Sequence, residues 1–334
     1  MKLSLVIPGL TWLDAHDGAE VARDLALPSL EWLLGRAAIR QAPETLSSQI
    51  AQSFGLSQLD IAQLAAKNDG LDVSTGHWLI ADPVHLRIDR DRATLADIGV
   101  MRVTDAEAAE LTEALNRHFA CDGLQFFAPS PGRWYLRSDA PLNVTFSALS
   151  DVIGDNVDDH RPRGAQALDW SRKLNEIQML LFAHPVNEAR EVHAEPALNS
   201  LWLWGQGDTQ PSRQPARAVF CDPGLLSLLA RTAGAEPQAM PYSFDALREC
   251  APQDAWVYLD RLLAAAQYRD AWGWRETLVA LETDWFAPLV AALRRREVSE
   301  LTLITHGPAG FHARLRHTDR WMFWRRPRAL TSLY

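Results

Sequence analysis

The stretch LNEIQMLLFAHPVNEAREVHAEPALNSLWLWGQG, residues 174–207, decides the fold of this chain of 334 residues. The run LNEIQMLLF continues a helical pattern from residue 167, in which apolar residues recur every three or four positions. Pro185 cannot continue the helix and Asn187 tolerates a turn, so HPVN predicts a helix stop. The apolar run SLWLWG (200–205) then predicts a buried strand that closes on a glycine turn.

Strand-like runs alternate with helical segments in much of the remaining chain. Such alternation predicts an α/β fold, with a mostly parallel sheet that has helices on both faces. In sheets of this kind, sites form outside the carboxyl ends of the strands. The other strand-like runs are LSLVIPG (3–9), ARAVFCD (216–222), AWVYLD (255–260) and LTLITHG (301–307), and helical periodicity marks 224–233 and 275–297.

The middle third of the chain has a different pattern. Residues 76–89 look extended, and residues 104–120 form a helix that opens with a capping box of Thr104 and Glu107. Residues 122–138 predict a hairpin around the turn PSPG. We therefore expect a small α+β module at residues 73–164, inserted into an α/β domain made of residues 1–72 and 165–334.

The composition is that of a globular protein, with 47% apolar and 22% charged residues. The net charge of −9 at pH 7 gives no electrostatic reason to expect nucleic acid or an anionic membrane as a partner. One basic stretch, WRRPR (324–328), is either a local patch or a solvated tail.

The cellular location follows from the first residues, the apolar runs and the cysteines. The opening apolar run predicts a strand rather than a signal peptide, and no run reaches the roughly 18 residues of a membrane helix. Cys121, Cys221 and Cys250 are scattered without metal-binding spacing, so we expect them to act as small apolar residues. These features predict a cytoplasmic protein.

The stretch 174–207 resembles the archaeal-type cofactor-independent phosphoglycerate mutases, which belong to the alkaline phosphatase superfamily. In that family a helix ends in HPVN, an arginine follows, and an asparagine leads into a strand that closes on a Gly-X-Gly turn. Residues 27–37 and 47–56 resemble two further helices of the superfamily, the second of which carries the nucleophile. Residues 77–95 look like a signature of a proteobacterial family labelled as a regulatory or uncharacterised protein. The residues that match the mutase motif are His184, Pro185, Val186, Asn187, Arg190, Asn199, Gly205 and Gly207.

The resemblance implies an alkaline-phosphatase-like fold and a site in which two divalent cations activate a serine or threonine. Carboxylates and histidines hold these ions in the superfamily, because hard cations need oxygen ligands to replace their water. This sequence departs from that pattern at each expected position. Pro8-Gly9 replaces Asp-Gly after the first strand, Gln49 replaces the Asp after the nucleophile, Thr305-His306 replaces the Asp-His pair, and Tyr258, Leu263 and Gln267 occupy the positions after the fourth strand.

Three histidines lie in THGPAGFHARLRH (305–317). His306 and His317 lie where the resemblance implies two metal ligands, and we interpret them as the relic of a metal site that holds no ion. Two other interpretations stay open: a zinc site with His312 as the third imidazole, and an ordinary polar loop. No cofactor is therefore expected, and a divalent metal only if the protein is an enzyme.

Ser48 is the candidate catalytic residue. A serine hydroxyl becomes a nucleophile only with the help of a base or a metal, and no neighbour in the sequence supplies one. The alternative interpretation is a polar residue early in a helix.

The candidate ligand-binding residues are His184, Asn187, Arg190 and Asn199. The guanidinium of Arg190 can fork onto an acidic group. The alternative is that HPVN only ends a helix.

These observations predict a non-catalytic regulatory or metabolite-binding relative of the mutases that has lost most metal ligands. Its partner would be an acidic or phosphorylated metabolite, or another protein, with neither nucleic acid nor membrane involved. The alternative is an active phosphatase or phosphomutase with a reduced metal site built from Ser48, His306 and His317.

Overall fold

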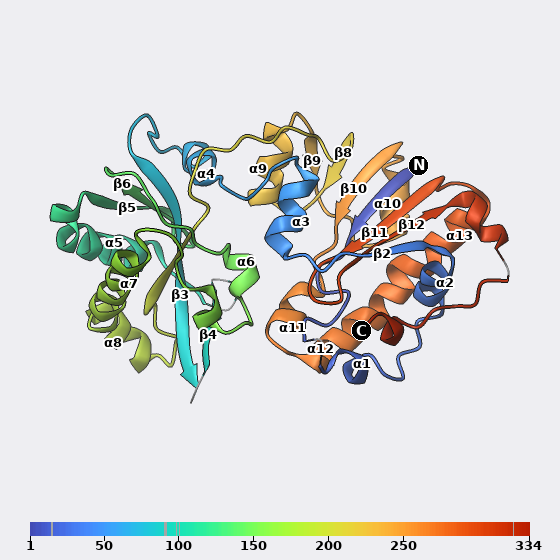
Figure 1. Ribbon diagram of the computed structural model, residues 1–334, viewed down its shortest axis with the longest axis horizontal. Coiled ribbons are helices and arrows are strands. Elements are labelled where there is room, and N and C mark those ends of the chain that lie inside the picture. Colours follow the sequence, from blue (N-terminus) through green and yellow to red (C-terminus); the bar gives the residue numbers. More distant parts are fainter. Residues whose placement is uncertain (15, 90–91, 98, 100, 323) are drawn as a thin grey trace. The chain divides into compact units, whose positions relative to one another are not determined.

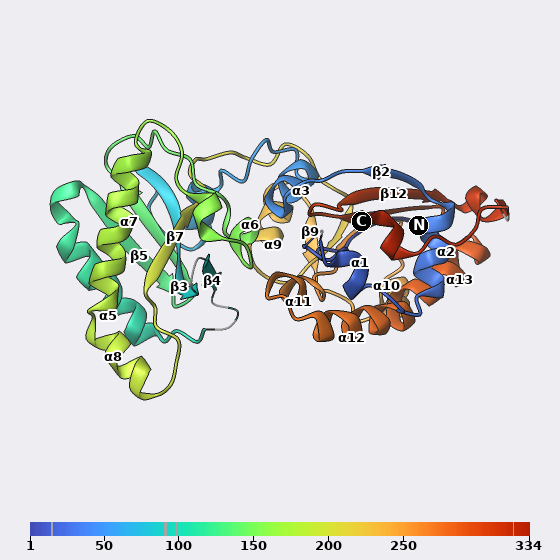
Figure 2. The ribbon, with the colours of Figure 1, turned by 60° about the horizontal axis from the view of Figure 1, so that its bottom comes forward.

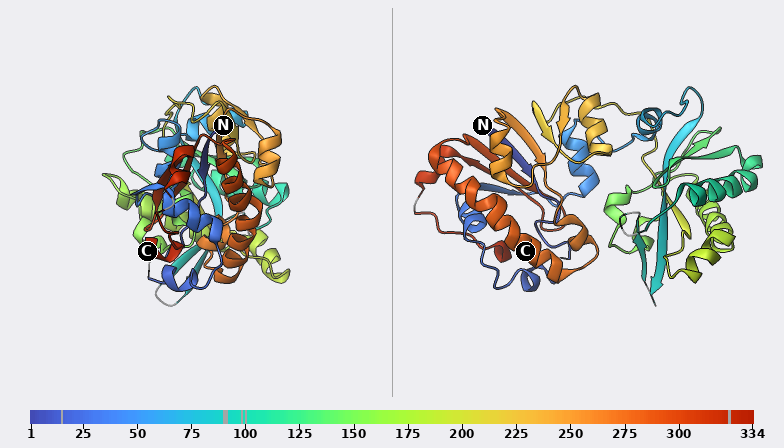
Figure 3. Two further views of the ribbon diagram at one scale, coloured as in Figure 1. Left: turned by 90° about the vertical axis from the view of Figure 1, so that its right-hand side faces the viewer. Right: turned by 180° about the vertical axis from the view of Figure 1, so that it is seen from behind.

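The computed structural model describes residues 1–14, 16–89, 92–97, 99, 101–322 and 324–334, which form two compact units (Figure 1). Unit 1 consists of residues 1–57 and 211–334, and unit 2 is the continuous segment 58–210. Both ends of the chain lie in unit 1 (Figure 3). Unit 2 is therefore an insertion into unit 1.

Unit 1 contains the strands β1 (Lys2–Val6), β2 (Ala38–Gln41), β8 (Ala218–Phe220), β9 (Glu236–Gln238), β10 (Asp254–Tyr258), β11 (Glu300–Thr305) and β12 (Phe311–Arg316). They form one sheet in the order β2-β12-β11-β1-β10-β8-β9. The pairs from β11 to β9 are parallel, whereas β12 runs antiparallel to both β11 and β2. The mostly parallel sheet predicted from the sequence pattern is confirmed.

Helices cover the sheet of unit 1. Apolar residues of α2, α10, α12 and α13 pack with the sheet in one core. On the opposite face of the sheet, Phe54 at the end of α3 meets Trp256 edge-on, with ring centres 5.8 Å apart. The helices of unit 1 are α1 (Gly18–Val21), α2 (Pro28–Arg36), α3 (Leu46–Ser53), α9 (Leu225–Thr232), α10 (Phe244–Glu249), α11 (Leu263–Gln267), α12 (Ala271–Leu281) and α13 (Ala287–Arg295), with 3-10 turns at His317–Trp321 and Leu330–Leu333.

A π-helical turn, Glu282–Phe286, joins α12 to α13. The carboxylate of Glu282 is buried there and accepts the backbone N–H groups of Ser29 (2.6 Å) and Leu30 (3.1 Å). These N–H groups belong to the first turn of α2 and have no partner within the helix, and a negative charge is favourable at that end. Glu282 therefore fixes the start of α2 against the α12–α13 helix pair.

Unit 2 is an antiparallel sheet, and its three longest helices pack against one face of it (Figure 2). The strands are β3 (His77–Asp89), β4 (Arg92–Ala96), β5 (Leu124–Ser130), β6 (Arg133–Ser138) and β7 (Ser200–Trp204). Their order is β4-β3-β6-β5, and β7 also pairs with β3. The helices are α4 (Ala62–Asn68), α5 (Asp105–His118), α6 (Leu149–Val152), α7 (Ala167–Phe182) and α8 (Pro185–Val192), with 3-10 turns at Ala120–Asp122 and Val157–His160.

Two local predictions for unit 2 are confirmed. β5 and β6 form the expected hairpin. At the start of α5, Glu107 N donates to Thr104 Oγ1 (3.3 Å) and Thr104 N donates to Glu107 Oε2 (2.8 Å), which is the predicted capping box. Within the described part of the chain, no helix combines the length and apolarity that a membrane span requires.

The boundaries of the inserted unit differ from the expected residues 73–164. Strand β7 pairs with β3, as Ser200–Trp204 lie opposite Ile80–Val84, and α7 packs in the core of unit 2. At the other boundary, Ala62 N donates to Gly205 O (2.7 Å). The inserted unit therefore extends over 58–210, because a fully apolar run such as SLWLW suits a buried antiparallel strand as well as a parallel one.

Candidate functional site

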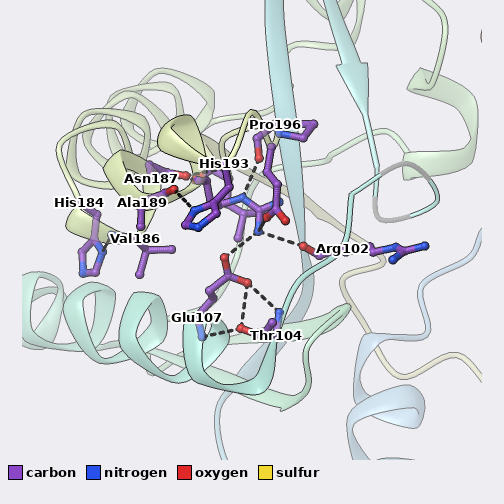
Figure 4. A network of polar contacts seen from close by, with 12 residues as sticks. Arg102, Thr104, Glu107, His184, Val186, Asn187, Ala189, His193 and Pro196 are labelled. Carbon is purple, nitrogen blue, oxygen red and sulfur yellow. Dashed lines mark hydrogen bonds and ion pairs between the residues drawn. The ribbon is translucent and has the colours of Figure 1, made fainter.

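Arg190, a predicted ligand-binding residue, belongs to a polar network of unit 2 and is only 2% exposed. Figure 4 shows this network, with Arg102, Glu107 and Pro196 labelled. Its Nε donates to Pro196 O (2.7 Å), and its Nη1 donates to Arg102 O (2.9 Å) and Glu107 Oε1 (2.7 Å). Burial by itself would raise the pKa of the Glu107 carboxyl, but hydrogen bonds from Thr104 and Arg190 outweigh it and lower that pKa. Arg190 therefore fastens α8 to the start of α5, and its fork does not face an acidic ligand.

Asn187 has a similar structural role. Its side chain is buried, and its Nδ2 donates to Leu181 O (2.7 Å) and Leu198 O (3.0 Å). The backbone N of Leu198 donates to Asn187 Oδ1 (2.7 Å). Asn187 therefore connects the end of α7 to the segment before β7.

His184 and Asn199 also bind backbone groups. The Nδ1 of His184 accepts the N–H of Val186 (3.3 Å) as the N-cap of α8. Asn199 Oδ1 accepts the N–H of Leu86 (2.7 Å), and its Nδ2 donates to Leu86 O (2.9 Å), so its amide extends the β3–β7 ladder. The structure therefore places the four predicted ligand-binding residues in the scaffold of unit 2 and does not gather them around a pocket.

The carboxyl end of β1 in unit 1 is closely packed. Gly9 has φ +75°, and a Cβ built there would lie 3.0 Å from Ala266 Cβ. Its carbonyl accepts a hydrogen bond from Trp274 Nε1 (2.7 Å). The position at which the superfamily has its Asp-Gly pair is therefore filled by apolar side chains and backbone.

Ser48 lies in the first turn of α3. Thr45, the N-cap of this helix, accepts the N–H of Ser48 (3.2 Å), and its hydroxyl donates to Ser48 Oγ (3.0 Å). These contacts are those of a helix cap. Among the described contacts of Ser48, none comes from a base that would activate the hydroxyl.

Some buried polar atoms have no hydrogen-bond partner among the described residues. They belong to one side chain next to Ser48 and to two side chains at the end of β11. They are both amide atoms of Gln49, Oγ1 of Thr305 and Nδ1 of His306. Burial lowers the pKa of His306 from 6.5 to about 4, so its imidazole is neutral at neutral pH. Buried polar atoms without partners are uncommon, and they often mark functional sites.

The three histidines of THGPAGFHARLRH do not come together. His306 follows β11, whereas His317 N donates to Ser299 O (2.9 Å) just before β11 begins. These histidines are therefore at opposite ends of the strand, roughly 20 Å apart, because a strand rises about 3.3 Å per residue. His312 Nδ1 accepts a hydrogen bond from Arg40 Nη2 on β2 (3.3 Å). A single ion cannot bind both His306 and His317, and the reduced site of Ser48, His306 and His317 is not formed.

Two carboxylates at the strand ends were not singled out as candidates. Asp222 follows β8 and Asp260 follows β10, and β8 and β10 are neighbours in the sheet. Burial and then the charge of Asp222 raise the pKa of the Asp260 carboxyl. Each aspartate stands two positions after a strand-like run, AVF or DAWVY. This position at the carboxyl end of a strand is the signal that could have identified them.

The described residues contain no group of three or more His, Cys, Asp or Glu side chains arranged to hold a metal ion. A site for two dications needs several carboxylates close together. The residues at the strand ends of unit 1 do not fit such a site, and we derive no chemical step through a metal.

The fold defines the class of protein. The chain is an α/β protein with a mostly parallel sheet and an inserted antiparallel unit, and no family model matches it. One solved structure with this fold is the PH0037 protein from Pyrococcus horikoshii, with a TM-score of 0.51 over 94% of this chain and 87% of that one. The two sequences are 13% identical, so this likeness concerns the fold alone.

Sequence comparisons identify the relatives more narrowly. The chain is 27% identical over 155 residues to a probable 2,3-bisphosphoglycerate-independent phosphoglycerate mutase of Geobacter sulfurreducens, which covers 46% of this chain and 38% of the relative. It is 28% identical over 214 residues to the 2,3-bisphosphoglycerate-independent phosphoglycerate mutase 2 of Methanothermobacter thermautotrophicus. This alignment covers 61% of this chain and 52% of the relative. The alignments span about half or less of these relatives. The resemblance to archaeal-type cofactor-independent phosphoglycerate mutases is confirmed, and the proteobacterial family stays a prediction.

These relatives correct one prediction. The expectation that no cofactor is involved is contradicted, because the chain is related to mutases of a superfamily that uses divalent metal ions. Divalent metals therefore belong in every assay of this protein, although the described residues do not identify their ligands.

Proposed function

We propose that this protein is a non-catalytic, regulatory or metabolite-binding relative of the cofactor-independent phosphoglycerate mutases. The observation that carries the proposal is the state of the strand ends in unit 1. Ser48 has the contacts of a helix cap, and His306 and His317 are separated by the length of β11. Among the described residues, no base contacts the Ser48 hydroxyl and no carboxylate-rich metal site is formed, so none of them is placed to remove its proton.

The charge balance supports the same proposal. Burial alone lowers the pKa of His306, and no neighbouring charge contributes to the shift. A carboxylate close to His306 would have the opposite effect on its pKa. The lowered pKa of His306 therefore gives no sign of the negative charge that two dications require.

A binding function remains well supported by the buried polar atoms of Gln49, Thr305 and His306. Each of these groups offers a neutral donor or acceptor to a polar ligand that reaches it. We propose that a metabolite or a protein partner in the cytoplasm is recognised on this unit. The HPVN motif of unit 2 is not the recognition site, since Arg190 and Asn187 are bonded to backbone groups and Glu107.

The test is a phosphoglycerate assay with the full chain. Interconversion of 3-phosphoglycerate and 2-phosphoglycerate would be followed by ³¹P NMR with Mn²⁺, Mg²⁺ or Zn²⁺ added, and an archaeal-type mutase would serve as positive control. We expect no interconversion and no release of inorganic phosphate. Turnover that disappears in Ser48→Ala but persists in the neighbouring Ser47→Ala would overturn the proposal in favour of an active phosphatase or phosphomutase.

A further inference from the structure

One face of α7 in unit 2 is exposed although it carries large apolar side chains. The opposite face of this helix packs in the core of unit 2 (Figure 2), where its buried residues are Trp170, Ile177 and Leu181. The exposed apolar side chains are Leu168, Met179 and Phe182, with exposed fractions of 66%, 73% and 77%. Single exposed apolar residues are ordinary, but several of them on one face mark a contact surface.

The exposed residues of this face lie in one line along the helix. They follow one another at intervals of four and three residues, and all of them are exposed. These intervals keep side chains on the same side of a helix, and they are the intervals of the contact line between two paired helices. We call this set the outer line of α7; it consists of Leu168, Arg172, Asn175, Met179 and Phe182.

The outer line has the same pattern when it is followed from either end. Asn175 is its middle residue, and Leu168 and Phe182 lie seven positions before and after it. In an antiparallel pair of α7 helices centred on Asn175, Leu168 of each copy therefore meets Phe182 of the other copy. The two Asn175 amides then face each other, and a single asparagine at such a position fixes the register of a helix pair. A contact of this kind uses the same surface on both copies, as in most dimers.

The charges beside the outer line suit the same arrangement. The ion pairs described on α7 join Lys173 to Asp169 (2.8 Å) and Glu176 to His118 (3.5 Å, ionic only when the imidazole is protonated), and neither involves Arg172. In the antiparallel pair, Arg172 lies opposite the position two residues beyond Glu176 of the other copy, a difference of about 3 Å along the helix. Both side chains are exposed and long enough to meet, and the symmetry of the pair forms this contact twice.

We propose that the outer line of α7 is the contact between two copies of this chain, which pack as an antiparallel helix pair centred on Asn175. A helix of 16 residues is about 24 Å long, so one pair of helices buries less than a standard interface of about 1,600 Å². We therefore expect association to require roughly 10 µM protein or more, and dilute protein to consist of single copies. The contact involves unit 2 alone, so it does not depend on the function proposed for unit 1.

The first test is sedimentation velocity of the full chain under reducing conditions, at roughly 1 to 200 µM, the range in which small interfaces dissociate. We expect the wild type to shift from one copy to two. Phe182→Glu and Leu168→Glu should weaken association by about tenfold or more, since each places a carboxylate against an apolar side chain of the other copy. Trp272→Glu on α12, with an exposed fraction of 73%, is the control and should associate as the wild type does. The proposal is overturned if the wild type stays a single copy throughout, or if Phe182→Glu associates like the wild type.

The second test is the arrangement of the two helices, measured as covalent dimer formed on mild oxidation of the concentrated protein. Asn175→Cys places one thiol of each copy at the centre of the pair, where they should form a disulfide. Leu168→Cys should not cross-link in this way, because the two copies of position 168 are about 21 Å apart along the pair, well beyond the roughly 7 Å that a disulfide spans. The wild type measures the background from the exposed Cys121 and Cys250. Equal cross-linking of both variants, or no cross-linking of Asn175→Cys above background, would exclude the antiparallel pair.

Discussion

The HPVN segment of unit 2 and the strand ends of unit 1 both contain buried polar side chains, but they differ in how these are satisfied. In unit 2, Arg190 and Asn187 bind carbonyl, N–H and carboxylate groups at 2.7 to 3.0 Å, and of their side-chain polar atoms only Nη2 of Arg190 lacks a partner among the described residues. In unit 1, Gln49, Thr305 and His306 contain buried polar atoms without partners among the described residues. The HPVN motif is therefore scaffold in this structure, whereas the strand ends of unit 1 leave several buried polar atoms without a partner among the described residues.

The difference teaches which residues a sequence motif can identify. A side chain that satisfies several backbone groups cannot be replaced without leaving those groups unpaired, which costs free energy whatever the protein does. The presence of such a motif therefore indicates the fold of a protein and not the reaction that it catalyses. Polar side chains in the two regions should therefore respond differently to replacement.

The largest effect is expected for Arg190→Leu. This change removes the donor that Glu107 Oε1 and the carbonyls of Arg102 and Pro196 share, at partly buried positions, and it takes away a buried charge, so the free energy of unfolding should fall by about 3–5 kcal/mol. Urea unfolding followed by circular dichroism would measure it. The exposed Arg172→Leu on α7 should change stability by less than about 0.5 kcal/mol. Equal stability of the wild type and Arg190→Leu would show that Arg190 is free for a ligand.

His306 should make unit 1 sensitive to acid. Its pKa is about 4 in the folded protein and 6.5 without burial, so protons bind more tightly to the unfolded chain. The stabilisation is complete above about pH 6.5 and declines as the pH falls towards 4, by about 3 kcal/mol in total. Unfolding measured between pH 7 and pH 4 should show a weaker pH dependence in His306→Gln than in the wild type. The control is His16→Gln, which removes an exposed imidazole; identical pH profiles for His306→Gln and the wild type would contradict the assignment.

Asn187→Ala should cost about 2–3 kcal/mol, because it leaves Leu181 O and both backbone groups of Leu198 without their side-chain partner. Thermal or urea unfolding would measure the loss. Asn175→Ala, at an exposed position of α7, is the matched control and should be neutral or slightly stabilising because alanine favours helices. A neutral Asn187→Ala would remove the main support for treating HPVN as scaffold.

The smallest effect, and the one with the opposite sign, is expected for Thr305→Val. Thr305 Oγ1 is buried without a partner, and Thr305 alternates with Leu301 and Leu303, which belong to the core. Replacing the hydroxyl by a methyl group of similar size should stabilise unit 1 by up to about 1 kcal/mol. Destabilisation by more than about 1 kcal/mol, measured under the same unfolding conditions, would mean that the hydroxyl has a partner.

The sequence predicts the fold well because periodicity and turn residues are local signals. The capping box of Thr104 and Glu107 and the hairpin around PSPG are set by residues close together in the chain. The pairing of β7 with β3 joins residues more than 100 positions apart. An apolar run in the sequence does not indicate with which other strand it will pair. For this reason the inserted unit is larger than expected.

The site was less predictable for the same reason. His306 and His317 are 11 positions apart in the chain, but β12 runs antiparallel to β11 and carries His317 back to the far end of the sheet. Arg190 is a suitable anion ligand by its chemistry, and only the structure reveals that Glu107, from another helix, occupies it. The spacing of residues in the sequence reveals neither the separation of the two histidines nor the ion pair of Arg190.

The central place of β1 has a consequence for how this chain reaches its folded state. β1 precedes unit 2 in the chain, but its neighbours β10 and β11 begin at Asp254 and Glu300, after unit 2. Unit 2 is continuous, so all of its strands are available once residue 210 has left the ribosome. Chains generally fold domain by domain as segments become available, and contacts between distant residues form slowly. The inserted unit is therefore expected to fold first during synthesis, whereas β1 can pair only after β10 and β11 have been made.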